Sequence, residues 1–286
     1  MIQVIISGLI AGSIIAFAVS GLSLIFGVAR MPHFAHGEAL MLGGMVALSL
    51  VADSGLPLIV GIIGGTLAAT ALGVAMLLLV YYPMRRFDEL NLMIAALAMV
   101  FIVEALAAML FGNQPREVPG ALDGTVHIFG AQATTMQVLI FFLGLIIVAG
   151  LYFSVKHTRW GRAIKAIAVD QDTALLMGIP VRRYWLLVFV IGSALAGLGG
   201  ALLGSVTPVF PGVGSVYSLN AFIVIIFAGG GSIWGGYIGA LALGIIRAAG
   251  ASYVSSAYVN SYGFILLLLV LLLRPQGLFG KGIARD

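Results

Sequence analysis

Long apolar runs separated by short polar segments make up most of the chain. A helix needs about 20 mostly apolar residues to cross a hydrocarbon core of about 30 Å. The runs that approach or exceed this length are Met1–Ala29, Ala39–Ala52, Ser54–Met84, Leu90–Phe111, Thr134–Val155, Tyr184–Ile246 and Ala248–Leu273. Tyr184–Ile246 contains no Lys, Arg, Asp or Glu and is too long for one span, so it must fold back on itself. The pattern predicts an all-α polytopic membrane protein with eight or nine transmembrane helices, some of them broken or re-entrant.

Composition excludes the soluble alternatives. Of the 286 residues, 62% are hydrophobic and 8% are charged, and the mean hydropathy is +1.17. A soluble domain carries about 25% charged residues. These few charges cannot solvate a globular surface, which excludes a soluble enzyme, a disordered chain and a nucleic-acid-binding module. Because Cys is absent, the chain has no disulfide, thiolate metal site or catalytic Cys.

The basic residues predict the orientation in the membrane. Most of them form three clusters: Arg85-Arg86, then Lys156, Arg159, Arg162, Lys165, Arg182 and Arg183, and finally Arg274, Lys281 and Arg285. Lys and Arg favour the cytoplasmic side of a membrane. Placing all three clusters inside puts the N-terminus outside and the C-terminus in the cytoplasm. It also requires an even number of crossings after Arg183, either four or two plus a re-entrant hairpin.

A polar segment, Met31–Glu38, separates the first two apolar runs, and we call it the break. Pro32 disrupts a continuing helix, and ionisable side chains at membrane depth are costly and often functional. His33, His36 and Glu38 therefore either line the translocation route or brace the break, and His36 could instead cap a helix without a role in transport. We predict no metal site, because only one carboxylate is near the His-x-x-His pair and no His-Glu-x-x-His pattern exists.

Small and isolated polar residues occur inside the apolar runs. Glycines recur at a spacing of four at Gly8 and Gly12, Gly61 and Gly65, Gly200 and Gly204, and Gly231, Gly235 and Gly239. This spacing places them on one helix face for close packing, although some could permit unwinding, and the glycines of Gly229–Gly236 favour a break and a turning point. Asn220 and Ser232 are further candidates to line a cavity. Glu104 and Arg247 are expected to pair with polar backbone groups.

The longest polar interruption is the segment 156–183. Residues 161–168 predict a helix with Ile164 and Ile167 on one face. Asp170 is placed to cap a short helix through Met177, which Gly178 can close in the left-handed conformation before Pro180. An ordinary basic loop is one interpretation. The apolar face and the two stop signals favour a docking element for a soluble partner.

Three stretches in a fixed order carry a family resemblance. They are Gly21–Val28 continuing through Phe34-Ala35-His36-Gly37-Glu38, then Gly161–Ile164 through Leu176–Ile179 and Ala196–Gly200, and last Phe227–Gly236 with Arg274-Pro275-Gln276-Gly277-Leu278-Phe279-Gly280. In these stretches the sequence resembles the LivH-type permease subunit of bacterial ABC importers for branched-chain amino acids. The stretches span nearly the whole chain.

The resemblance implies one permease domain over residues 1–286 in the bacterial inner membrane. It implies as partners a second homologous permease, two cytoplasmic ATP-binding subunits that hold ATP and Mg, a periplasmic solute-binding protein and membrane lipid, with no nucleic acid. Segment 172–180 falls where such importers place their coupling loop, although Asp-Thr-Ala replaces the usual Glu-Ala-Ala start. The expected coupling residues are Arg162, Lys165, Asp172, Ala174 and Gly178.

The absence of a Gly-x-x-x-x-Gly-Lys-Ser/Thr motif indicates that the chain binds no ATP in the P-loop manner. We therefore expect a non-enzymatic transport subunit without a cofactor of its own, which moves solute by alternating access. An ABC permease for urea or short amides and an ion-coupled secondary transporter remain alternatives. An intramembrane enzyme is disfavoured because its residues would have to cluster, and here the acids are scattered.

Overall fold

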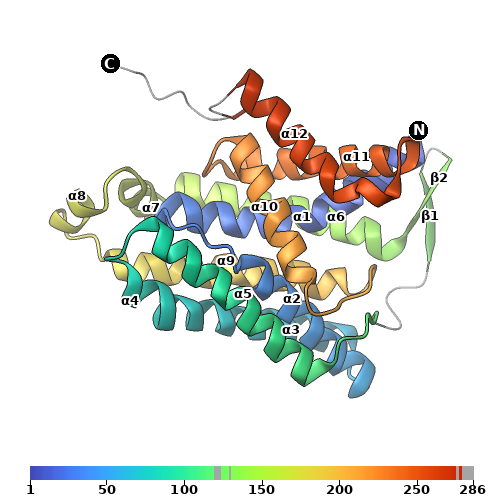
Figure 1. The fold of residues 1–286 in the computed structure, drawn as a ribbon, viewed down its shortest axis with the longest axis horizontal. Helices are drawn as coiled ribbons and strands as arrows, with labels where there is room; N and C mark the ends of the chain where they lie inside the picture. The colour runs from blue at the N-terminus through green and yellow to red at the C-terminus, as the bar shows by residue number, and fades with distance from the viewer. Residues whose placement is uncertain (119–123, 129, 275–276, 279–286) are drawn as a thin grey trace.

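The computed structural model describes residues 1–118, 124–128, 130–274 and 277–278, and most of them are helical (Figure 1). The helices are α1 (Ile2–Ala29), α2 (His36–Leu48), α3 (Leu58–Met76), α4 (Tyr82–Met84), α5 (Glu89–Phe111), α6 (Thr135–His157), α7 (Arg159–Val169), α8 (Gln171–Leu176), α9 (Val181–Leu203), α10 (Val213–Ala228), α11 (Ile233–Tyr253) and α12 (Val259–Leu273). Strands β1 (Thr125–Ile128) and β2 (Ala131–Thr134) pair as an antiparallel hairpin.

In the described part of the chain, seven helical segments are long and apolar enough to cross a membrane. They are α1, the continuous segment Leu58–Met84, α5, α6, α9, α11 and Ser256–Leu273. The all-α polytopic prediction is thus confirmed. The expected eight or nine spans would also have to include α2 and α10, which fall short of the other seven in length or apolar character.

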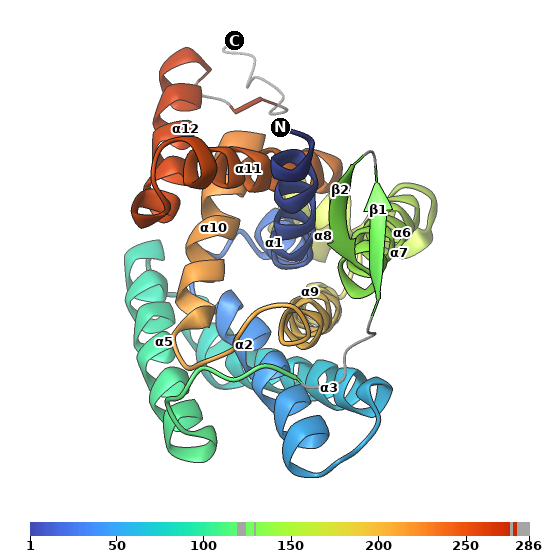
Figure 2. The same cartoon turned by 90° about the vertical axis from the view of Figure 1, so that its right-hand side faces the viewer.

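The core is built around α1 and α9. Seen along the helices in Figure 2, these two lie inside the bundle, with α3, α5, α6 and α12 around them. Glycines allow backbones to approach there, as the spacing of four predicts. Gly8 and Gly12 of α1 face the backbone of α11, and a Cβ on Gly12 would lie 2.7 Å from the Ala240 carbonyl oxygen. Gly200 of α9 contacts the carbonyl oxygen of Leu40 on α2.

The predicted turning point between Gly229 and Gly236 exists as a tight loop. Helix α10 ends at Ala228, and Gly229 and Gly231 have φ values of 88° and 83°, which favour glycine. Ser232 caps α11 by accepting the Gly235 N–H at 3.1 Å. Gly231 therefore precedes α11, and its expected place on one helix face with Gly235 and Gly239 is wrong.

Two π-helical segments interrupt the regular geometry. One, Ser49–Asp53, extends α2, and the other, Leu77–Tyr81, joins α3 to α4. Such segments carry one extra residue per turn and occur frequently at functional sites. The second segment places Tyr81 completely inside the protein, beside the break between α1 and α2.

Candidate functional site

The break between α1 and α2 begins at a residue in the left-handed conformation. Arg30 has φ 51° and ψ 30°, and its N–H donates to the Phe26 carbonyl oxygen at 3.1 Å. Among the described residues it is the one non-glycine with a positive φ. The predicted break is thus present. It is short, because α2 already begins at His36 and Glu38 lies in its first turn.

Both histidines of the break are completely buried. His33 Nδ1 and the Tyr81 hydroxyl share a hydrogen bond of 2.7 Å, and the His33 ring also lies 5.3 Å from the Phe189 ring. His36 donates from Nε2 to the Ala18 carbonyl oxygen at 3.1 Å. The two imidazole centroids are 5.4 Å apart. The break is therefore joined to α1, to the π-helical segment before α4 and to α9.

Glu38 is also completely buried, and its carboxylate oxygens have no hydrogen-bond partner in the described part of the chain. The backbone of Gly214, at the start of α10, packs directly on this carboxylate, since a Cβ there would lie 2.6 Å from Oε1. A Cβ on Gly212 would lie 3.9 Å from Glu104 Oε1. This buried oxygen also has no hydrogen-bond partner in the described part of the chain. Two carboxylates thus flank the first turn of α10, and the expected backbone partner of Glu104 is not found.

One side chain of α10, the Ser218 hydroxyl, forms hydrogen bonds with the backbone of the break. Ser218 accepts the Gly37 N–H at 2.7 Å and donates to the Phe34 carbonyl oxygen at 2.6 Å. Asn220, one of the predicted residues, is buried on the same helix with 4% of its surface exposed. Ser218 therefore joins the first half of α10 to both sides of the α2 start.

Ser232 lies apart from the other candidates. It follows the C-terminal end of α10, whereas Gly214 and Glu38 meet at the start of that helix. At about 1.5 Å per residue, the 16 residues of α10 separate the two places by about 24 Å. The structure brings His33 and His36 together, places Glu38 against the start of α10, and gives Ser232 the separate role of a helix cap.

The polar segment 156–183 folds as the sequence predicts. Asp170 accepts the N–H groups of Asp172 and Thr173 at 2.9 and 3.0 Å, and these bonds, first the one from Thr173, hold the pKa of its carboxyl below the usual value. Gly178 closes the turn after α8 with φ 79°. On α7, Ile164 and Ile167 face inward, and Ala174 of α8 is also buried.

The outer face of this element is apolar where α8 ends. Val169, Leu175, Leu176 and Met177 expose 78%, 55%, 88% and 78% of their surfaces. Arg162, Lys165, Asp172 and Gly178, the other expected coupling residues, are exposed around them. The element presents apolar side chains in an otherwise charged segment.

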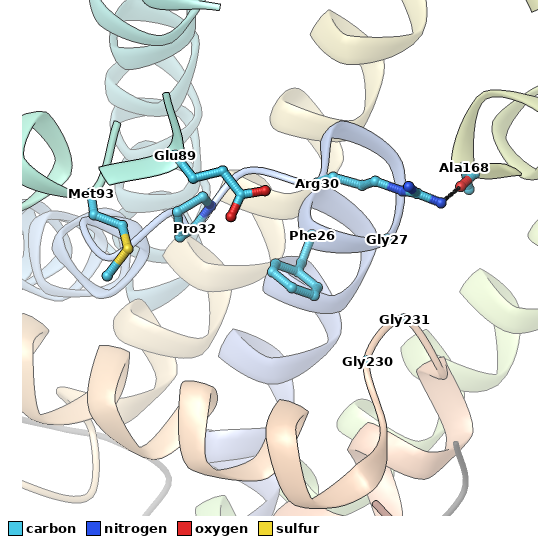
Figure 3. Close-up of a pocket in the computed structure, with 9 residues that line it drawn as sticks. All are labelled: Phe26, Gly27, Arg30, Pro32, Glu89, Met93, Ala168, Gly230 and Gly231. Carbon is cyan, nitrogen blue, oxygen red and sulfur yellow. Dashed lines mark hydrogen bonds between the residues drawn. The ribbon is translucent and has the colours of Figure 1, made fainter. Parts of the chain in front are cut away.

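Two side chains join this element to the end of α1. Arg30 donates from Nη2 to the carbonyl oxygens of Ala168 and Val169 at 2.6 and 3.3 Å, and Gln171 donates to the Val28 carbonyl oxygen at 3.3 Å. Figure 3 shows the Arg30 side chain pointing from the α1 end toward Ala168, away from Glu89. We call Arg30 and Gln171 the α1 clasp.

A cavity of about 570 Å³ adjoins the clasp. Its lining comprises Phe26, Gly27, Arg30, Pro32, Glu89, Met93, Ala168, Gly230 and Gly231 (Figure 3). The glycine loop before α11, the start of α5 and the α1 end therefore meet where the α7–α8 element attaches.

Residues 4–273 match the family described as the permease component of the branched-chain amino acid transport system. The chain belongs to this family. A family relative in Escherichia coli, the high-affinity branched-chain amino acid transport system permease protein LivH, is 33% identical over 98% of this chain and 96% of its own length. BraD of Pseudomonas aeruginosa, of the same description, is 32% identical over the same shares. A probable LivH of Methanocaldococcus jannaschii is 26% identical over 95% of this chain and 90% of its own.

Sequence inspection missed several of the residues that make these contacts in this permease-family chain. Ser218 and Gln171 are single polar residues without a motif, and their partners lie 184 and 143 positions away. Arg30 was visible only as a basic residue after an apolar run. The exposed Leu175, Leu176 and Met177 carried a signal, because an apolar triplet stood inside a charged segment.

Proposed function

We propose that this chain is the membrane-spanning subunit of an ATP-driven ABC importer for branched-chain amino acids. A second permease subunit of the family, two cytoplasmic ATP-binding subunits with their ATP and Mg, and a periplasmic solute-binding protein complete the importer. Membership of the permease family supports the transport role. In this proposal the chain hydrolyses no ATP and provides the route for the solute by alternating access.

The position of the basic clusters supports a cytoplasmic location for the end of the bundle that carries α7 and α8. Arg85, Arg86 and Arg182 line one groove together with Gln171 and Asp172 of α8. After α12, the Leu278 N–H donates to the Phe227 carbonyl oxygen at 2.7 Å, which holds Leu278 near the α10–α11 loop, while Lys281 and Arg285 of the third cluster lie outside the described residues. Because Lys and Arg favour the inside, this end and the C-terminus face the cytoplasm of a bacterial inner membrane in our proposal.

The exposed apolar patch on α8 is the observation that carries the proposal. Leu176 and Met177 are largely exposed in a charged segment, where apolar surface in contact with water is unfavourable. A groove on an ATP-binding subunit would bury them. Arg162, Lys165 and Asp172 then supply polar contacts at the rim of that interface.

The α1 clasp offers a route from the ATPase to the membrane core. When the ATPase subunits close, α7 and α8 move, and the hydrogen bonds from Arg30 and Gln171 pull the end of α1 with them. This displacement of α1 is transmitted to the break, because the break follows Arg30 in the chain. In addition, His36 of the break donates a hydrogen bond to the Ala18 carbonyl oxygen of α1. The hydrogen bond between the Gly37 N–H and the Ser218 hydroxyl then transmits the displacement to α10.

The start of α10 is the proposed place where solute passes. The unpaired carboxylates of Glu38 and Glu104 can receive an ammonium group, and N–H groups of a helix start favour a carboxylate. His33, His36 and Asn220 complete the polar surface, which would become accessible when the helices separate. Ser232 acts at the far end of α10 as the cap of α11.

Copurification tests the docking function. We expect the ATP-binding subunits to copurify with the wild-type chain from membranes and to be lost from a Leu176→Glu, Met177→Glu double variant, with folded yield unchanged. His127→Glu is the matched control, because it places a carboxylate at an exposed position of β1. Equal ATPase recovery with the double variant, or leucine uptake by the purified chain without any ATPase, contradicts the proposal.

A further inference from the structure

Arg247 is an isolated charge in the second half of the membrane region. Between Tyr184 and Leu273 it is the only Lys, Arg, Asp or Glu. It lies on α11, six positions before Tyr253, or about 9 Å from the end of the helix at about 1.5 Å per residue. An ionised side chain inside a membrane-spanning helix is expensive and needs a compensating partner.

The partner found in the chain is neutral. Arg247 donates from Nη2 to Asn260 Oδ1 of α12 at 3.0 Å. In the described residues the one ion pair joins Arg116 to Asp53, so the Arg247 guanidinium is without a carboxylate there. A guanidinium presents five N–H donors in a planar fork that fits carboxylate or phosphate oxygens, and a single amide oxygen leaves most of that capacity unused.

Open space adjoins this guanidinium. A cavity of about 300 Å³ lies between α1, α10, α11 and α12 and is lined by Ser7, Ala11, Ile15, Tyr217, Gly244, Arg247, Ala248, Ala251 and Val259. Small residues surround the charge on α11 itself, and Ser7 and Tyr217 add hydroxyl groups. The cavity therefore combines a positive charge, neutral donors and room for a small polar group.

We propose that this cavity binds an anionic oxygen group, a carboxylate or a phosphate, with Arg247 as its principal ligand. The charge of the anion compensates the guanidinium, and the Ser7 and Tyr217 hydroxyls can donate to its remaining oxygens. Two sources have this chemistry: the phosphate of an anionic lipid and the carboxylate of the transported solute. The second source rests on the proposed function, and the first is independent of it.

The test compares three variants of the assembled transporter in lipid nanodiscs. Arg247→Gln removes the charge, Arg247→Lys keeps it, and Ala251→Leu fills the cavity without touching the guanidinium. Arg116→Gln is the control, because it removes a guanidinium that is 41% exposed and lies outside both the cavity and the α7–α8 element. The first readout is phosphatidylglycerol retained through purification, measured by native mass spectrometry against phosphatidylethanolamine. The second is leucine uptake at saturating solute-loaded binding protein, with ATP hydrolysis measured in parallel.

A lipid site predicts that Arg247→Gln and Ala251→Leu retain about tenfold less phosphatidylglycerol than the wild type, Arg247→Lys and the control. A solute site predicts equal lipid retention and a roughly tenfold loss of uptake in the same two variants, with ATP hydrolysis preserved. If both readouts are unchanged in Arg247→Gln and Ala251→Leu, Arg247 only joins α11 to α12 and the proposal is overturned. If the wild type fails to take up leucine, the proposed function fails, while lipid retention still decides the anion site.

Discussion

The α1–α2 break and the α7–α8 element distribute polar and apolar side chains in opposite ways. In the break, His33, His36 and Glu38 are completely buried among helices, whereas in the α7–α8 element Leu176 exposes 88% of its surface. Either arrangement is costly by itself, because buried polar atoms need partners and exposed apolar surface orders water. The difference teaches that the break is covered by the chain's own helices, although both Glu38 oxygens and one nitrogen of each histidine have no hydrogen-bond partner in the described residues. The α7–α8 element leaves apolar side chains uncovered, which in our proposal an ATP-binding subunit buries.

The largest expected effect comes from the packing of the break. In Gly37→Ala the new Cβ would overlap the Gly214 carbonyl oxygen and lie 2.6 Å from Ser218 Oγ, both of which belong to α10. Because backbone cannot give way as a flexible side chain can, we expect a loss of about 3 kcal/mol or more of stability and most of the folded yield. Thermal unfolding in detergent measures it.

Gly150→Ala is the matched control for that substitution. Gly150 lies inside α6 with open space where its Cβ would be, so the change should be neutral or stabilise by up to about 1 kcal/mol. If both variants unfold at the wild-type temperature, the break is not closely packed and the contrast between the two regions disappears.

Neutralising the buried polar groups tests their part in transport. Glu38→Gln keeps the shape of the side chain and removes its charge, and His36→Ala removes the bond to the Ala18 carbonyl oxygen. We expect leucine uptake in proteoliposomes to fall about tenfold in each, with ATPase subunits still bound. Unchanged uptake and ATP coupling in both variants would remove these residues from the proposed route.

Removing the hydrogen bonds of the α1 clasp should weaken the coupling between ATP hydrolysis and solute transport. Arg30→Ala removes the bonds to Ala168 and Val169 but keeps a left-handed backbone that alanine disfavours. Arg30→Gly removes the same bonds and relieves the backbone, so it should be at least as stable as Arg30→Ala. We expect both to transport roughly three- to tenfold less solute per ATP hydrolysed.

The two Arg30 variants also distinguish coupling from folding. Solute uptake and phosphate release, measured together on one proteoliposome preparation, give the ratio directly. Recovery of the wild-type ratio in Arg30→Gly would show that the backbone conformation matters and that the guanidinium does not transmit the movement.

The smallest effect concerns the cap of α8. The pKa of the Asp170 carboxyl lies below its usual value of 3.8, chiefly because the Thr173 N–H donates to it. A lowered pKa in the folded protein stabilises the cap above that value, and the contribution disappears as the pH falls below it. We expect the amide hydrogens of α8 to exchange only a few times faster at pH 3 than at pH 6 after correction for the intrinsic rates.

Asp170→Asn keeps a capping oxygen without a titrating charge, so its corrected exchange in α8 should not depend on pH. Equal pH dependence in the variant and the wild type would show that another group controls the fraying of this helix.

Local signals in the sequence were sufficient for the α7–α8 element. Asp170, Gly178 and Pro180 each act within a few residues, and the caps and turn they predict are present. The glycine loop after Ala228 was equally visible. The α1 clasp, the Ser218 contacts and the approach of Gly214 to Glu38 could not be found in this way, because they join segments far apart in the chain through helix packing.

The rule that a membrane span needs about 20 mostly apolar residues located only some of the helices. Four of the expected runs correspond closely to the single helical segments α1, Leu58–Met84, α5 and α6. The run Tyr184–Ile246 contains most of α9, all of α10 and part of α11, and the run Ala248–Leu273 joins the end of α11 to α12. In addition, α2 begins with His36 and Glu38 and α10 has 16 residues, so neither fits a simple count of spans. The burial of α2 depends on its neighbours, as the contacts of Gly37 and Gly200 show, whereas α10 is apolar and falls short of a span only in length.

The π-helical segment before α4 fixes the rotational register of two adjacent tyrosines. Tyr81 points inward to His33, while the Tyr82 ring lies between the guanidinium groups of Arg85 and Arg182, at 4.2 and 4.5 Å. Converting this segment to regular α-helix would turn everything after it by about 100°. Tyr81 would then leave the imidazole, and Tyr82 would leave Arg182 of α9, whereas Arg85 would turn with it. The extra residue in this one turn therefore lets a single helix contact the buried break through one ring and the arginines at the end of the bundle through the next.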